Sequence, residues 1–179
     1  MKTTEILIAG FGGQGILFSG KFLAYKGLIE ELQVSWLPSY GPEMRGGTAN
    51  CNVILSDTPV GSPIITTPDV LVAMNLPSLQ KYVDTVVAGG QIYVDSSLID
   101  ATVERTDVEV FYIPATQMAK DNGISSLANM IIVGHLLENH PELSFDGTAE
   151  VVEKLVPPKK EALKELNMKA LNLGKTYKA

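Results

Sequence analysis

Four glycines stand between the first apolar segment of the chain and a helical pattern. They are Gly10, Gly12, Gly13 and Gly15, with Gln14 among them, and the first, second and fourth satisfy the spacing G-x-G-x-x-G. Glycine lets backbone N–H groups approach a phosphate closely, and the N-terminus of the following helix adds a partial positive charge. The segment therefore indicates a preformed anion site. The alternative is that the glycines only let the helix pack closely on the sheet.

A second candidate segment is the stretch of residues 39–47, Ser-Tyr-Gly-Pro-Glu-Met-Arg-Gly-Gly, which has no regular period and is predicted to be a loop. Arg45 within it is a permanently charged, bidentate donor, and the two following glycines allow close approach to a phosphate or carboxylate. The alternative is an ion pair with Glu43 or with an acid of another subunit, because Tyr, Met and Arg are also typical of interfaces. The candidate binding residues in this loop are Ser39, Tyr40, Arg45, Gly46 and Gly47.

An NAD site of the usual kind also needs Asp or Glu at the end of the second strand, about 20 residues past the glycines, to bind the ribose. Pro38, Ser39 and Tyr40 occupy that place, and the nearest acid, Glu43, lies inside the loop. The sequence thus argues against a nicotinamide dehydrogenase. A Rossmann-like nucleotide-binding or regulatory module and a purely structural subunit stay open as alternatives.

No set of residues for self-contained catalysis is recognisable. The chain has two histidines, His135 and His140, and one cysteine, Cys51, which together make no convincing zinc site. Strand alternation predicts that Cys51 faces the core, whereas a nucleophilic cysteine needs a partly exposed, electropositive setting. Neither a G-x-S-x-G nor a Walker sequence is present. We therefore expect no catalytic residue and no metal site in this chain.

Composition limits the class of protein further. The length of 179 residues predicts a single domain over residues 1–179, and 45% hydrophobic with 19% charged residues is typical of globular proteins. The net charge of −6 argues against binding of nucleic acid. One cysteine supplies neither an internal disulfide nor the four thiolates of an iron–sulfur cluster. The N-terminal sequence has no room for a signal peptide and no apolar run reaches membrane-spanning length, so we expect a cytoplasmic protein.

Alternating strands and helices position these segments. We predict an α/β fold, a three-layer Rossmann-like and mostly parallel sheet with helices on both faces. Ile16, Gly20, Leu23 and Gly27 form one stripe of the first helix, which predicts close packing on the sheet. Residues 60–67 are predicted as an edge strand or an irregular connection. Strands are predicted from residue 4 to the glycine turn and at 33–37, 48–55, 69–74, 91–94 and 108–113, and later helices at 77–86, 116–122, 125–138, 146–155 and 158–173.

The helix at about 158–173 is amphipathic, with Leu163, Leu166, Ala170 and Leu173 on one face, and Gly174 is predicted to end it. This pattern fits a terminal helix packed on its own core. It fits a helix lying against a partner subunit equally well.

Gly-Phe-Gly-Gly-Gln-Gly at 10–15 together with the 39–47 loop, which leads into Thr-Ala-Asn-Cys-Asn-Val, resembles the gamma subunit or gamma domain of the 2-oxoacid:ferredoxin or acceptor oxidoreductases. The resemblance covers essentially the whole chain, including Pro-Asp-Val-Leu-Val-Ala-Met-Asn at 68–75 and Ser-Leu-Ala-Asn-Met at 126–130. The pyruvate, 2-oxoglutarate and 2-oxoisovalerate types all fit. Nothing in these residues selects the 2-oxoacid.

The resemblance implies an assembly that oxidatively decarboxylates a 2-oxoacid with coenzyme A and passes electrons to ferredoxin or a similar acceptor. Thiamine diphosphate and iron–sulfur clusters would be held by partners, which are alpha and beta subunits and a ferredoxin-like delta subunit. This chain would support assembly and be inactive alone. The glycine turn and the Arg45 loop then become candidates for contact with the phosphate or pantetheine part of coenzyme A.

Overall fold

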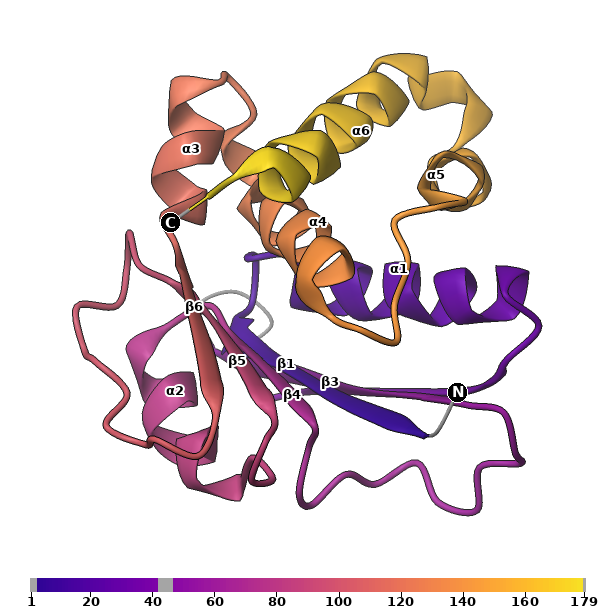
Figure 1. The fold of residues 1–179 in the computed structure, drawn as a ribbon. Coiled ribbons are helices and arrows are strands. Elements are labelled where there is room, and N and C mark those ends of the chain that lie inside the picture. The colour runs from indigo at the N-terminus through magenta and orange to yellow at the C-terminus, as the bar shows by residue number, and fades with distance from the viewer. Residues whose placement is uncertain (1–2, 42–46, 179) are drawn as a thin grey trace.

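The computed structural model describes residues 3–41 and 47–178, which form an α/β fold around one six-stranded sheet (Figure 1). The strand order is β2-β3-β1-β4-β5-β6. Strands β1, β4, β5 and β6 are parallel, whereas β3 runs antiparallel to both of its neighbours, β1 and β2. The predicted mostly parallel sheet is therefore confirmed, with a β2–β3 hairpin added at one edge. The strands are β1 (Thr4–Phe11), β2 (Gln33–Tyr40), β3 (Thr48–Ser56), β4 (Val70–Ala73), β5 (Gln91–Asp95) and β6 (Glu109–Ile113).

The second strand is longer than the sequence predicts. Pro38 does not end β2, which continues through Ser39 to Tyr40 and pairs with β3 along its whole length. Proline is tolerated there because β2 is an edge strand, so its missing N–H does not have to join a second ladder. Ser39 and Tyr40 are thus strand residues and not loop residues. Residues 60–67 were predicted as an edge strand or an irregular connection. The connection at 57–69 contains no strand, so the second alternative is confirmed.

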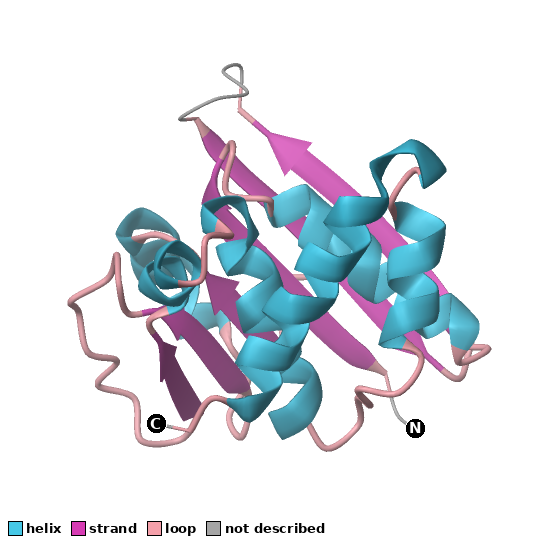
Figure 2. Ribbon diagram, turned by 90° about the horizontal axis from the view of Figure 1, so that it is seen from above, coloured by secondary structure: helices cyan, strands magenta, loops and turns pink. Residues whose placement is uncertain are grey.

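Helices cover both faces of the sheet unequally, as Figures 1 and 2 show. Helix α2 packs on one face, where Leu79 meets Leu7, Leu71 and Ile92 in a small core. The other helices lie on the opposite face and enclose the larger core, with α6 packed on α4. No helix in the described part of the chain is both long and apolar enough to cross a membrane. The helices are α1 (Ile16–Ile29), α2 (Leu76–Tyr82), α3 (Ala115–Asp121), α4 (Ala128–Asn139), α5 (Thr148–Leu155) and α6 (Glu161–Thr176), with short 3-10 turns η1 (Val83–Thr85), η2 (Ser125–Leu127) and η3 (Pro158–Lys160).

Helix α1 approaches the β2–β3 hairpin as closely as the glycine stripe predicts. A Cβ at Gly20 would overlap Cys51 Sγ, and one at Gly27 would come within 2.6 Å of Leu55 Cδ2. The prediction that Cys51 faces the core is confirmed, since this side chain is fully buried. Burial raises the pKa of the Cys51 thiol to about 12, so it stays protonated at neutral pH.

Helices α4 and α6 cross in direct backbone contact. Gly134 in α4 and Gly174 in α6 lie where any Cβ would overlap the partner's backbone, at Leu171 O and Ile131 O respectively. Gly174 therefore does not end α6, which continues to Thr176. The sequence prediction of a C-terminal glycine cap was wrong because this glycine serves helix contact and not a left-handed turn.

Candidate functional site

The glycine turn lies at the carboxyl end of β1, between that strand and α1. Gly10 belongs to the strand, where it pairs with Ala49 of β3, so the turn begins later than the sequence predicts. Gly13 and Gly15 have φ of 101° and 76°, a left-handed conformation that favours glycine. Gly10 is needed for a different reason, because a Cβ there would lie 2.6 Å from Gln14 Oε1. Left-handed φ thus explains Gly13 and Gly15, and lack of space explains Gly10.

Gln14 joins the ends of two parallel strands. Its Oε1 accepts a hydrogen bond from the Phe11 N–H at 2.6 Å, and its Nε2 donates to Met74 O, just past β4, at 2.8 Å. Strands β1 and β4 are neighbours whose following helices, α1 and α2, pack on opposite faces of the sheet. Open α/β sheets bind ligands at such a point, outside the carboxyl ends of the strands. The glycine turn therefore occupies the position in this fold that is most favourable for a ligand.

No side chain of α1 caps the N-terminus of this helix or offsets its partial positive charge. Its N-cap is Gly15, which makes no side-chain capping bond, and the first turn carries no acidic residue. The first N–H groups of an α-helix have no intrahelical acceptor, and their dipoles give partial positive charge. This end of the helix is suited to an anionic group.

The structure brings part of the second candidate segment to the same place. The Gly12 N–H donates to Gly47 O at 2.8 Å, and Tyr40 pairs with Ala49 beside the turn. Tyr40, Gly12 and Gly13 line one cavity of about 310 Å³. Ser39 points to the other side of β2, because side chains alternate along a strand. Arg45 and Gly46 lie outside the described residues.

Two further cavities, of about 330 Å³ and 210 Å³, are also lined by Gly13, so three cavities adjoin the turn.

Asn129 of α4 lines the 330 Å³ cavity and forms hydrogen bonds to the turn and to α1. Its Nδ2 donates to Gly15 O at 3.1 Å and to Ser19 Oγ at 2.9 Å. Sequence reasoning did not single out Asn129 as a site residue. The available signal was an amide in the first turn of a helix, directly before the apolar run Met130–Val133.

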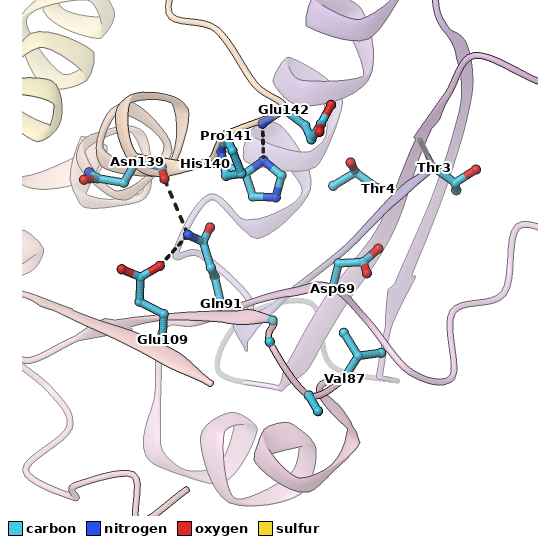
Figure 3. Close-up of a pocket in the computed structure, with 13 residues that line it drawn as sticks. Thr3, Thr4, Asp69, Val87, Gln91, Glu109, Asn139, His140, Pro141 and Glu142 are labelled. Carbon is cyan, nitrogen blue, oxygen red and sulfur yellow. Dashed lines mark hydrogen bonds between the residues drawn. The ribbon is translucent and has the colours of Figure 1, made fainter. Parts of the chain in front are cut away.

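Another cavity, of about 440 Å³, lies at the opposite end of the sheet, beside the starts of β1, β4, β5 and β6. Figure 3 shows hydrogen bonds of two of its polar side chains, Gln91 and His140. Gln91 Nε2 donates to Glu109 Oε2 at 2.8 Å and to Asn139 O at 3.4 Å, and Asp69 Oδ2 accepts from the Glu5 N–H. Burial lowers the pKa of His140 at its rim. The size of this cavity does not make it a better candidate than the glycine turn, because ligands of such sheets bind at the carboxyl ends of the strands.

His135 lies inside an aromatic cluster with Tyr93, Phe111 and Tyr177. Its Nδ1 lies 3.0 Å from Gly174 O, and burial lowers its pKa. Within the described ranges, no three His, Cys, Asp or Glu side chains come together as a metal site.

Comparison with known proteins gives relatives along the whole chain. The sequence model of the family described as pyruvate ferredoxin/flavodoxin oxidoreductase matches residues 5–177. The chain is 39% identical over 171 residues to ketoisovalerate oxidoreductase subunit VorA of Methanothermobacter thermautotrophicus, covering 95% of this chain but 35% of that one. It is 37% identical over 178 residues to 2-oxoglutarate synthase subunit KorC of Methanothermobacter marburgensis, covering 96% and 94%. The chain thus spans about a third of the ketoisovalerate subunit and nearly all of the 2-oxoglutarate subunit.

Solved structures agree with the sequence comparison. The gamma subunit of a keto/oxoacid ferredoxin oxidoreductase from Geobacter sulfurreducens superposes with a TM-score of 0.79 at 28% identity, over 96% of both chains. A 2-oxoglutarate:ferredoxin oxidoreductase from Magnetococcus marinus, described with 2-oxoglutarate, coenzyme A and succinyl-CoA bound, superposes with a TM-score of 0.87 at 28% identity, over 98% of this chain and 31% of that one. The resemblance in the glycine turn and the 39–47 segment is therefore confirmed, and the chain belongs to the pyruvate ferredoxin/flavodoxin oxidoreductase family.

Proposed function

We propose that this chain is the gamma-type subunit of a multi-subunit 2-oxoacid oxidoreductase. The assembly converts a 2-oxoacid and coenzyme A to acyl-CoA and CO₂ and passes the electrons to ferredoxin or a similar acceptor. The observation that carries the proposal is the near end-to-end match to the 2-oxoglutarate synthase subunit, 96% of this chain and 94% of that one. A cytoplasmic location stays a prediction.

The redox and decarboxylation chemistry is assigned to partner chains, the proposed alpha and beta subunits and a ferredoxin-like delta subunit. A cluster held by four thiolates does not fit this chain, which has one cysteine, and that cysteine is buried. Thiamine diphosphate is likewise assigned to the partners. What remains for this chain is to support assembly and to help bind a substrate of the complex.

The substrate group that fits the described residues is an anion, such as a phosphate of coenzyme A. The uncapped N-terminus of α1, with Gly12, Gly13 and Gly15 beside it, supports this assignment because its N–H groups are suited to a phosphate. Tyr40 lines the same hollow. Gln14 stabilises the turn by accepting a hydrogen bond from the Phe11 N–H, and Gly10 leaves room for its side chain. Gly47 accepts a hydrogen bond from the Gly12 N–H. Ser39, Arg45 and Gly46 stay predictions from sequence.

Purification of the native protein tests the subunit role. We expect the chain to co-purify with a thiamine-binding subunit and an iron–sulfur subunit; persistent isolation without either would refute the proposal. In the purified complex, Arg45→Ala should raise the KM for coenzyme A if the loop contacts that substrate, since lost uniform binding appears in KM. If the loop contacts only protein, the same change should weaken assembly and leave this KM unchanged. Tight calorimetric binding of NAD(H) to the isolated chain would favour a nucleotide-binding module instead.

A further inference from the structure

The cavity of about 440 Å³ lies at the end of the sheet opposite to the glycine turn, and we name it the α4-end cavity. Its wall is formed by the starts of β1, β5 and β6, the turn at residues 87–90, and residues 139–142, where α4 ends (Figure 3). This volume lies in the range of small-molecule sites. The cavity shares no lining residue with the three cavities that adjoin the glycine turn, so it is considered by itself.

The ionisable side chains at the wall of this cavity are carboxylates, apart from one histidine. The acids are Asp69, Glu109 and Glu142, and no described lysine or arginine belongs to the wall. Glu109 accepts a hydrogen bond from Gln91 Nε2 and Asp69 accepts one from a backbone N–H, so neither bond supplies a positive charge. Burial, and next the charge of Asp69, raise the pKa of the neighbouring Glu5, as expected where negative charge is not balanced. The cavity therefore favours a cation.

The end of α4 adds partial negative charge to the same space. This helix is 12 residues long and carries no basic residue in its last turn. The last C=O groups of an α-helix have no intrahelical donor, and their dipoles favour a positive charge. Residues 139–142, which follow these carbonyls, belong to the wall of the cavity. The helix end and the carboxylates thus favour the same kind of ligand.

Thr4 supplies a polar group at the wall that has no partner. It is 3% exposed, and Figure 3 shows its side chain facing the space bounded by His140 and Asp69. Its hydroxyl forms no hydrogen bond with another described residue, whereas the hydroxyl of Thr3 lies 2.8 Å from Ser56 Oγ. Buried polar groups are nearly always paired, so the Thr4 hydroxyl indicates a partner that does not belong to this chain.

His140 does not balance the acids at neutral pH. Its Nδ1 accepts a hydrogen bond from the Glu142 N–H at 3.2 Å, and burial lowers the pKa of the ring, which is therefore neutral. Within residues 3–41 and 47–178, no three His, Cys, Asp or Glu side chains gather closely enough to hold a metal ion. Val87 and Pro141 add apolar surface to the wall. These features suit an organic cation, whose N–H groups are spread over an apolar body.

We propose that the α4-end cavity binds a small organic ammonium cation. The N–H groups of this ligand donate to the carboxylates of Asp69, Glu109 and Glu142, and its alkyl part lies on the apolar surface. Thr4 Oγ1 and the carbonyls at the end of α4 accept the remaining N–H groups. The proposal goes beyond the proposed function and does not rest on it, because it concerns the opposite end of the sheet. A failed test here leaves the subunit role as it stands.

The experiment is calorimetric titration of the full chain at pH 7.5 in an amine-free buffer, with three probes of one chain length. 1,4-Diaminobutane carries two ammonium groups, 1,4-bis(trimethylammonio)butane carries the same charge without N–H donors, and 1,4-butanediol is uncharged. We expect 1,4-diaminobutane to bind at least about tenfold more tightly than either of the others, the factor that corresponds to one hydrogen bond to a charged group. Equal binding of the two dications, or no binding of 1,4-diaminobutane, overturns the proposal.

Thr4→Val separates recognition from structure, because valine keeps the shape of threonine and lacks the hydroxyl. We expect about tenfold weaker binding of 1,4-diaminobutane with an unchanged or higher Tm of the free chain, since the hydroxyl has no partner there. Thr4→Ser keeps the hydroxyl and should restore binding. A lower Tm with unchanged binding in Thr4→Val would show a purely structural threonine and overturn the proposal.

Asp69→Asn removes one negative charge and keeps an oxygen that can accept from the Glu5 N–H. We expect binding of 1,4-diaminobutane to weaken at least about tenfold. Asp100→Asn is the matched control, because it makes the same charge change at an exposed position that does not line the cavity. Equal weakening by the two variants would mean attraction to the overall negative charge of the chain, and that result overturns the proposal.

A measurement on the unmodified chain guards against variants that fail to fold. The backbone amide signals of Thr4, His140 and Glu142 in ¹⁵N NMR should shift when 1,4-diaminobutane is added, and those of Gly12 and Gly13 at the other end of the sheet should not. Shifts that are absent at saturation, or that spread evenly over both ends of the sheet, overturn the inference.

Discussion

Replacement of Gly15 by alanine tests whether the glycine turn and Asn129 form one unit. Gly13 and Gly15 both have left-handed φ, of 101° and 76°, so alanine at either position is strained by about 1–2 kcal/mol. The two positions differ in the space available to an added Cβ. Nothing lies within 4 Å of a Cβ at Gly13, whereas a Cβ at Gly15 would lie 2.5 Å from Asn129 Nδ2. Only Gly15→Ala must therefore displace Asn129 and its two hydrogen bonds, each worth about 1 kcal/mol.

We expect Gly13→Ala to lower the free energy of unfolding by about 1 kcal/mol and Gly15→Ala by about 3 kcal/mol. Urea unfolding followed by fluorescence of Trp36, the one tryptophan, measures both. The double variant Gly15→Ala/Asn129→Ala should lose about 2 kcal/mol less free energy of unfolding than the sum of the two single losses. Each single change already removes the same two hydrogen bonds of Asn129. Equal losses for the two glycine variants, or strict additivity in the cycle, would refute the reasoning.

Two further predictions concern the packing of α4 and α6. Gly174→Ala should lower the free energy of unfolding by more than about 3 kcal/mol, because its Cβ would overlap the backbone oxygen of Ile131, which cannot rotate away. Thermal denaturation measures this loss, with Gly61→Ala as the neutral control in open space; equal Tm values would contradict it. The second prediction concerns pH. Burial lowers the pKa of His135, so the unfolded chain binds the proton more readily than the folded chain. The free energy of unfolding should therefore fall as pH drops below about 6.5, the ordinary histidine pKa. Urea unfolding at pH 5.5 and 7.5 should show a smaller acid loss for His135→Gln than for the wild type, and an identical loss would contradict this account.

Sequence periodicity was sufficient for most of the fold. The apolar run at 69–74 predicts a central strand buried on both faces, and every residue of β4 is buried. The glycines at positions 20 and 27 predict close packing of α1, and Cys51 and Leu55 lie where a larger side chain would collide. These features are visible in sequence because they depend on which face of one element is apolar or small, and that is a local property of the chain.

The errors have a common cause in contacts between distant segments. Pro38 lies inside β2 because the hairpin places that strand at the edge, and sequence alone does not give strand order. Gly174 looked like a helix end, but its role is set by Ile131, far away in the chain.

The candidate site divides in the same way. The sequence by itself determined the glycine turn, the family and the lack of a ribose-binding acid after the second strand, because motifs and spacing are local. Only the tertiary structure decided that Gln14 joins β1 to β4, that Gly12 holds Gly47, and that Thr4 and His140 line one cavity. Hydrogen-bond partners and unpaired buried atoms depend on which elements fold against each other, and a linear pattern does not contain that information.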